Sequence, residues 1–562
     1  MLNILRPDAL KVDGILKQKM DEVISLSSKI NDDVVDSKIS MLNGQWLLPN
    51  DGSNKWVEPV SILENPVACI KQLDKTLLLA KRIRSKDLII QLANYTKDIY
   101  ENIFKENTEE KIIIAEKASI ELISYCISLY NLIHKQFLIN LANEVNALMP
   151  NYVNFIQNME VVKPSNPNVP EGTPENESTI KFYAERHELA HGEKVADCVK
   201  AAVLNFKCSG LARTTEAALR GLKLLDKYHG TIHGAYTAND YLAGRCPNIP
   251  VNINAASKFF VALQSLFCAT DDLSVADRME TIACNLLPAY INENKIQIMQ
   301  TTNQCDIGKR VRPWPYAEVT TCKFFNVNEK LREYKNFLDA ANALRSTIWL
   351  KKNGKGIALI FPFESTVLYN VDGVPVQLTL KGNYPFGEDM EITINTKDEV
   401  AFPLYIRIPG YTAGATIAVN KEAAQPAVTG SYYVISRNFK KGDKIYIKFP
   451  IAIKINKFYR RSYAVFKGPI IMAYPQDSKK KCYENLALDL ETTPNLVDEN
   501  SQLIKANVFR FDGKYDCNCK VPLMPECDTT NHESIELKPY ANCLNRLAQF
   551  ATIQIDEGKN EA

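Results

Sequence analysis

Residues 391–396 read EITINT and residues 404–409 read LYIRIP, and in both stretches apolar and polar side chains alternate. The same alternation recurs in three neighbouring segments, ATIAVN (415–420), YYVISR (432–437) and KIYIKFP (444–450). A period of two places one face of a strand against a core and the other face in water. Short, evenly spaced strands separated by turns that contain Gly, Pro and Asn predict a β-sandwich.

The sequence before Trp349 has a different period. Apolar residues recur every three or four positions in RTTEAALRGLKLLDKYHG (213–230), NAASKFFVALQSLF (254–267) and SVADRMETIACNLL (274–287). This spacing is typical of amphipathic helices that bury one face. Gly230 stands where the first of these helices is expected to end, and we expect it to act as the C-cap.

The change of period sets the expected domain organisation. A chain of 562 residues is longer than one hydrophobic core usually supports. We therefore expect a multi-domain protein of both α and β structure, with a helical domain over 1–350, a β-sandwich over 351–455 and a C-terminal β-rich region over 456–562. Residues 161–179 contain four prolines and few apolar side chains, so a long loop is expected there.

Composition argues against several kinds of partner. The 67 basic and 65 acidic side chains nearly balance, and no long basic block is present, so a nucleic-acid partner is not expected. No apolar run approaches the ~18 residues that a membrane span requires, and the N-terminus has no signal-peptide pattern, so a cytoplasmic location is the default. A carbohydrate ligand and a homo-oligomer remain open.

The 14 cysteines are spread along the chain without a dense disulfide framework, which favours reduced or buried thiols. The group Cys517, Cys519, Cys527 and Cys543 has a spacing that fits no strong zinc pattern.

A series of segments in a fixed order points to one family. They are LKVDGILKQKM (10–20), LKLLDKYHG (222–230), DYLAGRCP (240–247), ADRMETIACNLLPA (276–289), TTNQ (301–304), RPWP (312–315), FPLYIRIPGY (402–411), FKKGDKIYIKFP (439–450), FKGPIIMAYP (466–475) and PYANCLNRLAQF (539–550). Together they resemble the β-L-arabinofuranosidases of glycoside hydrolase family 127. The resemblance spans about residues 10 to 550 and implies an (α/α)₆ helical toroid followed by β-sandwich domains.

The resemblance also implies a chemistry that this chain lacks. Family members are understood to use a cysteine nucleophile on a zinc ion, held by a Glu-x-Cys stretch and a later Cys-Cys pair. These positions fall on residues 252–254, Asn-Ile-Asn, and near Arg332 and Glu333. Asparagine amides are poor zinc ligands and an arginine opposes a cation. The sequence therefore predicts a divergent member without the zinc–thiolate apparatus, with no metal and no other cofactor.

The segment 228–254, YHGTIHGAYTANDYLAGRCPNIPVNIN, corresponds to the stretch that leads into the family's sugar site. The side chains expected to bind substrate are His187, His229, His233, Tyr236, Tyr241 and Trp314. The carboxylates expected to serve a glycosidase are Asp240 and Glu333. Glycines beside these residues would let the backbone approach a ligand closely.

HELAH (187–191) is a competing signal, because His-Glu-x-x-His on a helix binds zinc in metalloproteases. Three functions therefore stay open. The first is a non-catalytic carbohydrate-binding or assembly protein that retains a glycosidase-like fold. The second is an active glycosidase on furanosides or related glycans that uses substituted carboxylates. The third is a zinc metalloprotease.

Overall fold

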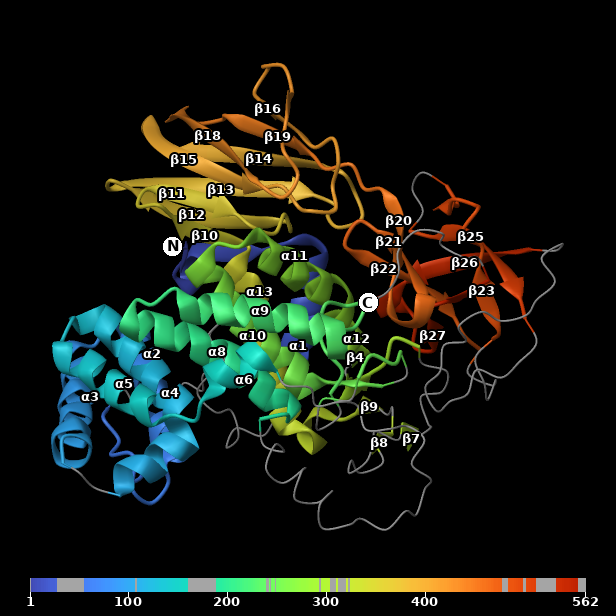
Figure 1. Cartoon of the computed structure of the whole chain (residues 1–562). Coiled ribbons are helices and arrows are strands. Elements are labelled where there is room, and N and C mark those ends of the chain that lie inside the picture. The colour runs from blue at the N-terminus through green and yellow to red at the C-terminus, as the bar shows by residue number, and fades with distance from the viewer. Residues whose placement is uncertain are drawn as a thin grey trace, which may run out of the picture.

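The computed structural model describes residues 2–27, 55–106, 109–159, 189–238, 242, 244–247, 249–292, 295–303, 310–311, 320–321, 324–477, 484–498, 502–511 and 532–553. Helices dominate the described residues before Trp349 and strands dominate those after it, as Figure 1 shows. The mixed α and β architecture with a sheet-rich C-terminal region, predicted from the change of period, is confirmed. The proline-rich stretch 161–179 lies outside the described residues.

Several helices begin at residues whose side chains accept from exposed backbone N–H groups. Asn65, Ser85 and Asn252 each accept from an N–H in the first turn of the helix that follows. The helices are α1 (Gly14–Ser27), α2 (Pro66–Ile83), α3 (Lys86–Ile99), α4 (Glu110–Ile133), α5 (Gln136–Leu148), α6 (Tyr152–Asn158), α8 (Gly192–Ser209), α9 (Arg213–His229), α10 (Ile253–Thr270), α11 (Leu273–Thr281), α12 (Leu287–Ala289) and α13 (Leu331–Thr347). π-helical turns, Tyr100–Phe104 and Ile282–Leu286, continue α3 and α11.

Helices α10 and α13 lie side by side and run in the same direction. Asn336 Nδ2 donates to Asn254 Oδ1 at 2.7 Å in the first half of the two helices, and Gln264 Nε2 donates to Ser346 Oγ at 2.8 Å in the second half. Both pairs are separated by 82 positions in the chain, as parallel neighbours with a constant offset require. Helix α8 packs against α10 on its other side.

Two sheets follow the helices. The first has the order β1 (Leu2–Ile4), β10 (Trp349–Lys352), β11 (Gly356–Leu359), β15 (Val400–Arg407) and β18 (Tyr432–Phe439). The second has the order β17 (Gln425–Pro426), β16 (Thr416–Val419), β19 (Lys444–Lys448), β14 (Asp389–Thr396), β13 (Val374–Gly382), β12 (Ser365–Val371) and β2 (Leu10–Val12). The alternation predicted from the sequence is seen in their burial. In β14, for example, Met390, Ile392 and Ile394 are buried while the residues between them are not.

A third sheet lies in the C-terminal region, beside the helices in Figure 1. Its order is β20 (Ile453–Lys457), β21 (Tyr463–Lys467), β22 (Ile470–Pro475), β26 (Glu533–Pro539), β25 (Ile504–Arg510), β23 (Leu486–Leu488) and β28 (Ala551–Thr552), with β24 (Asn495–Leu496) on β25 and β27 (Arg546–Leu547) on β22. Short pairings among the helical residues join β3 (Val251–Asn252) to β6 (Met299–Gln300), β5 (Lys295–Gln297) to β4 (Ile291–Asn292) and β9 (Phe324–Phe325), and β7 (Arg310–Val311) to β8 (Thr320–Thr321).

The N-terminus departs from the expected helical start. Residues 2–4 pair with β10 and residues 10–12 pair with β12, so the first dozen residues extend both sheets. Leu10 and Val12 are buried while Lys11 between them is exposed, which is a short strand pattern. One continuous hydrophobic core, running from Leu2 to Phe449, joins these strands to the helices.

A buried ion pair fastens α11 to the first sheet. Arg407 on β15 donates to Glu280 Oε2 at 2.9 Å, and both side chains are fully buried. Arg407 also contacts Asp277 and donates to the carbonyl of Ile360. The Tyr384 hydroxyl donates to Glu280 Oε1 at 2.6 Å, so both carboxylate oxygens are bonded. Glu280 and Arg407 belong to the sequence segments 276–289 and 402–411, which supply much of the family resemblance.

Replacing Arg407 with Met should lower the free energy of unfolding by about 3–5 kcal/mol, because Glu280 would stay buried without its cation. Lys355→Met is a matched control, since the Lys355–Asp372 ion pair is exposed on both sides and should contribute less than about 1 kcal/mol. Urea denaturation of both variants is the measurement. Equal effects would contradict a central role for the buried pair.

Candidate functional site

A cleft of about 410 Å³ lies among α4, α6, α8, α10 and α13. It is called the charged cleft below, because basic and acidic side chains make up most of its lining. The lining residues are Glu116, Lys117, Ser119, Ile120, Glu121, Tyr152, His191, Glu193, Lys194, Asp197, Lys258 and Arg332. These side chains come from helices far apart in the sequence, so only the folded chain assembles the cleft.

Glu193 forms two ion pairs in the charged cleft. Its Oε2 atom lies 2.8 Å from Lys258 Nζ and its Oε1 atom lies 2.6 Å from Arg332 Nη2. The Glu193 side chain is only 10% exposed, whereas that of Arg332 is 68% exposed. Arg332 therefore stands at the mouth of the cleft, and Glu193 is held beneath it between two cations.

Helix geometry also favours a negative charge at Glu193. Glu193 lies in the first turn of α8, Lys258 lies in the second turn of α10, and Arg332 lies in the first turn of α13. Contacts among these three residues bring the N-termini of three helices to one place. The N-terminus of a helix carries a partial positive charge and free N–H groups, so it stabilises an anion.

The two carboxyl groups that α8 presents to the cleft have pKa shifts in opposite directions. Burial alone would raise the pKa of Glu193, but the charges of Lys258 and Arg332 and the hydrogen bond from Lys258 lower it below its ordinary value. Burial raises the pKa of Asp197, and the nearby Glu121 adds to the rise while Lys258 opposes it. Asp197 is one helical turn beyond Glu193, so both project from the same face.

The positions matched to the family's zinc ligands do not suit a metal ion. Asn252 Oδ1 caps α10 by accepting from the N–H of Asn254 at 2.7 Å. Asn254 is 4% exposed, and its Oδ1 atom accepts from Asn336. Arg332 carries a positive charge and is bound to Glu193. The amide oxygens are thus engaged within the protein, and the third position repels a cation. Across the described residues, no three His, Cys, Asp or Glu side chains gather as metal ligands.

Three of the side chains expected to bind substrate are buried, and two of them bond to the backbone. His229 is 1% exposed, and its Nδ1 atom accepts from the N–H of Gly244 at 2.9 Å. His233 is fully buried, and its ring stands edge-on to Tyr540 with centroids 4.7 Å apart. The Tyr236 hydroxyl donates at 2.7 Å to the carbonyl of Gly192, the first residue of α8. Of these, Tyr236 acts on the charged cleft indirectly, by fixing the start of α8.

Among the other predicted site residues, the structure describes only Glu333. Glu333 neighbours Arg332 on α13 but is not among the lining residues. The remaining ones, His187, Asp240, Tyr241 and Trp314, lie outside the described residues. Of the four cysteines considered for zinc, only Cys543 is described, and it is a buried free thiol.

The described part of the HELAH motif is not helical. Leu189 and Ala190 form a turn, and His191 is the N-cap of α8, where its Nδ1 atom accepts from the N–H of Glu193 at 3.3 Å. A metalloprotease motif needs both of its histidines on one helix face. His191 here precedes the helix, and an Nδ1 atom that accepts this bond caps the helix instead.

Sequence reasoning missed Glu193, Asp197 and Lys258. One signal was present, since Glu193 and Asp197 are spaced i, i+4 and so share a helix face. Lys258 and Arg332, the partners of Glu193, lie 65 and 139 positions beyond it, and no local pattern joins them.

Within the part of the chain that the structure describes, no helix has the length and apolar character of a membrane span.

Comparison with known proteins agrees with this architecture. Residues 357–451 match the middle domain of the β-L-arabinofuranosidase family GH127. This match confirms the predicted resemblance to glycoside hydrolase family 127. The GH127-like chain shares its fold with a solved GH127 β-L-arabinofuranosidase from Geobacillus stearothermophilus T6, at a TM-score of 0.63 and 16% identity over 96% of this chain and 91% of the other.

Two further solved structures are similar to this GH127-like chain, each over 98% of this chain and 98% of the other chain. One is a glycoside hydrolase with a TM-score of 0.68 at 13% identity, and the other is a GH127 β-arabinofuranosidase with a TM-score of 0.59 at 12% identity. Identities this low show the shared fold alone. No curated protein sequence gives a significant match.

The buried histidines predict an acid-sensitive fold. Burial lowers the pKa of His229 from 6.5 to about 4, so between these values the unfolded chain binds a proton that the folded chain does not. The resulting stability is complete above about pH 6.5 and is lost as the pH falls toward 4. At about 1.4 kcal/mol per pKa unit, His229 alone should cost about 3 kcal/mol across this range.

His229→Asn should flatten this pH dependence, because the amide oxygen can still accept from Gly244 but does not titrate. Urea denaturation of both proteins at about pH 7.5 and at about pH 5 gives the comparison. If the free energy of unfolding fell by the same amount between these two pH values in the variant and in the parent, His229 would be ruled out as a source of acid sensitivity.

Proposed function

We propose that the charged cleft binds carbohydrate and that this GH127-like chain does not use a zinc-held cysteine nucleophile. The observation that carries the proposal is the ion pair between Arg332 and Glu193. Arg332 stands where the family resemblance expects the cysteine pair. A guanidinium stays protonated and has no acceptor or nucleophilic lone pair, so it can hold a ligand oxygen but cannot attack an anomeric carbon.

The chemistry of the lining supports a sugar ligand. A cleft of about 410 Å³ has room for one or two sugar rings. Sugar hydroxyls both donate and accept hydrogen bonds, and the cleft offers carboxylate acceptors beside ammonium and guanidinium donors. The exposed guanidinium of Arg332 lies at the mouth, where an incoming ligand meets it first.

The proposal includes the finer architecture expected from the sequence. We infer that α8, α10 and α13 belong to the inner ring of an (α/α)₆ toroid, whose inner helices run parallel. The constant offset between α10 and α13 and the shared location of the three N-termini support this. We likewise infer a β-sandwich from the first two sheets, because both bury one face in the same core.

A second candidate function, a glycosidase that works with two carboxylates, is favoured by the opposite pKa shifts of Glu193 and Asp197. A carboxyl group with a raised pKa beside one with a lowered pKa is the pattern from which a general acid and a base or nucleophile are built. In this alternative Asp197 donates the proton to the leaving oxygen and Glu193 acts as the base or nucleophile.

Calorimetry with arabinose-, galactose- and mannose-containing oligosaccharides tests the binding proposal. At least one should bind, and Arg332→Ala should weaken that binding about tenfold because a charged donor is lost from the mouth of the cleft. Arg437→Ala is the matched control, since Arg437 forms its own ion pair with Glu422 on the sheet surface and should leave binding unchanged. No binding heat from any of these sugars by the folded protein would overturn the proposal.

A screen of aryl furanosides and pyranosides separates binding from catalysis. We expect no aryl alcohol release. Turnover that disappears in Asp197→Asn, with sugar binding retained, would instead establish the two-carboxylate glycosidase. Asn preserves the shape of the side chain but cannot donate the proton.

A further inference from the structure

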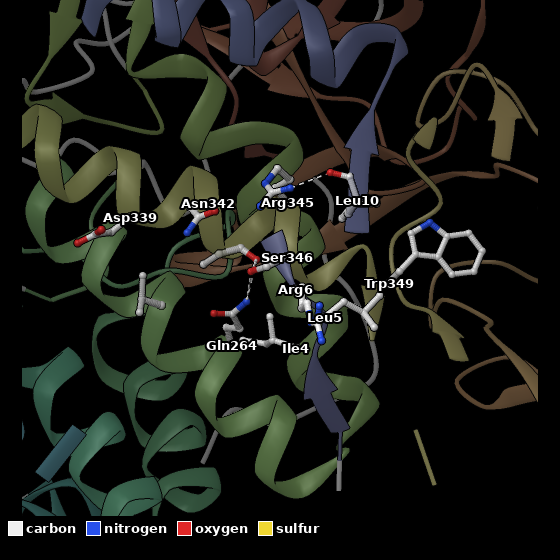
Figure 2. Close-up of a pocket in the computed structure, with 12 residues that line it drawn as sticks. Ile4, Leu5, Arg6, Leu10, Gln264, Asp339, Asn342, Arg345, Ser346 and Trp349 are labelled. Atoms are coloured by element: carbon white, nitrogen blue, oxygen red, sulfur yellow. Dashed lines mark hydrogen bonds between the residues drawn. The ribbon is translucent and has the colours of Figure 1, made fainter. Parts of the chain in front are cut away.

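A second cavity, of about 290 Å³, lies against α10 and α13, farther along both helices than the charged cleft. Its walls come from the middle of α10, from the C-terminal half of α13, and from the N-terminal segment 4–10, which runs from the end of β1 to the start of β2. It is called the strap cavity below, because residues 4–6 and Leu10 of that segment cross over it. Figure 2 shows the side chains that line it.

Two guanidinium groups belong to the lining of the strap cavity. Arg345 is 1% exposed, and one of its Nη atoms donates to the carbonyl of Leu10 at 2.9 Å, which ties α13 to the N-terminal segment. Arg6 is exposed and comes from the N-terminal segment itself. Two cations against one carboxylate, that of Asp339, make the lining favour a ligand that carries a negative charge.

The behaviour of Arg345 contrasts with that of the other fully buried arginine described above. Glu280 and Asp277 raise the pKa of Arg407, although burial opposes them. Burial lowers the pKa of Arg345 to about 10. An anion in the strap cavity would reverse that shift, because a nearby negative charge favours the protonated guanidinium.

The opposite part of the lining offers groups for hydroxyls. Gln264 Nε2 donates to the Ala343 carbonyl at 2.9 Å and to Ser346 Oγ and Thr347 Oγ1, each at 2.8 Å. These bonds fix the amide, and Figure 2 shows its oxygen turned away from Ser346. No hydrogen bond to Gln264 Oε1 is found among the described residues, so this atom remains an acceptor for a ligand hydroxyl.

Asp339, Asn342 and Arg345 follow one another along α13, as Figure 2 shows. At 1.5 Å per residue, Asp339 and Arg345 are about 9 Å apart along the helix axis. The cavity therefore has a cationic end at Arg345 and an acceptor-rich end at Asp339, with the Asn342 amide between them. A ligand that matches this order has an anionic group at one end and hydroxyls along the rest.

We propose that the strap cavity binds a polyhydroxy anion of about monosaccharide size, with its carboxylate or phosphate between Arg345 and Arg6 and its hydroxyls toward Gln264, Asn342 and Asp339. This site is separate from the charged cleft and does not depend on the function proposed for it. Because the ligand bridges the N-terminal segment and α13, its binding also stabilises the packing of that segment.

Calorimetry on the full-length chain with gluconate, glucose 6-phosphate and glucose tests the proposal. At least one of the two anions should bind while neutral glucose does not, and the comparison tells whether a carboxylate or a phosphate is preferred. Arg6→Gln should weaken binding about tenfold. The Arg6 side chain is exposed, so this variant should fold normally even if Arg345→Gln does not.

Arg332→Ala distinguishes the two cavities, because it alters the charged cleft and leaves the strap cavity intact. Anion binding that is weakened by Arg6→Gln and unchanged in Arg332→Ala supports the proposal. Three results would overturn it: no binding of either anion, glucose binding as tight as gluconate binding, or anion binding lost only in Arg332→Ala. The last result would place the anion in the charged cleft.

Discussion

The contact between Arg407 and Glu280 is the constraint on which the arrangement of helices and sheets depends. A guanidinium and a carboxylate, both fully buried, are tolerated only when each finds its partners. Arg407 finds Glu280, Asp277 and a backbone carbonyl, and Glu280 also accepts from Tyr384. The pairing is directional, unlike the surrounding apolar contacts, so it fixes how α11 meets β15. A shifted sheet would leave a buried charge without a partner.

The position of α11 in turn helps to fix the positions of the helices that build the charged cleft. Helix α11 follows α10 directly, and α10 packs between α8 and α13. Glu193, Lys258 and Arg332 meet because these three helices begin at the same level. Tyr236 contributes from a distance, because its bond to Gly192 fixes the first residue of α8. The electrostatics of the cleft therefore rest on helix register rather than on loop residues.

The sequence predicted the architecture because its signals are local and periodic. The alternation in residues 391–396 and the three-to-four spacing in 254–267 both reflect which side of an element meets the core. The site was harder to predict because its pairings are long-range. His229 and Tyr236 lie in a glycine-containing segment that is typical of ligand loops, yet both are buried and bond to backbone atoms. Asn252 could have been recognised as a cap, since it directly precedes an apolar helical stretch.

Gly230 is the C-cap of α9, as the sequence predicted, and its backbone there is extended. A Cβ there would lie 2.7 Å from the Cα of Asp226, so close packing is the reason for glycine at this position.

The charges of the two cavities act largely independently of each other. Arg332 and Arg345 stand near opposite ends of α13, about 20 Å apart along its axis, so the Coulomb interaction between the charges of the two cavities is weak. Any coupling between them must pass through the packed pair α10 and α13, whose hydrogen bonds at both ends keep the two helices in fixed register.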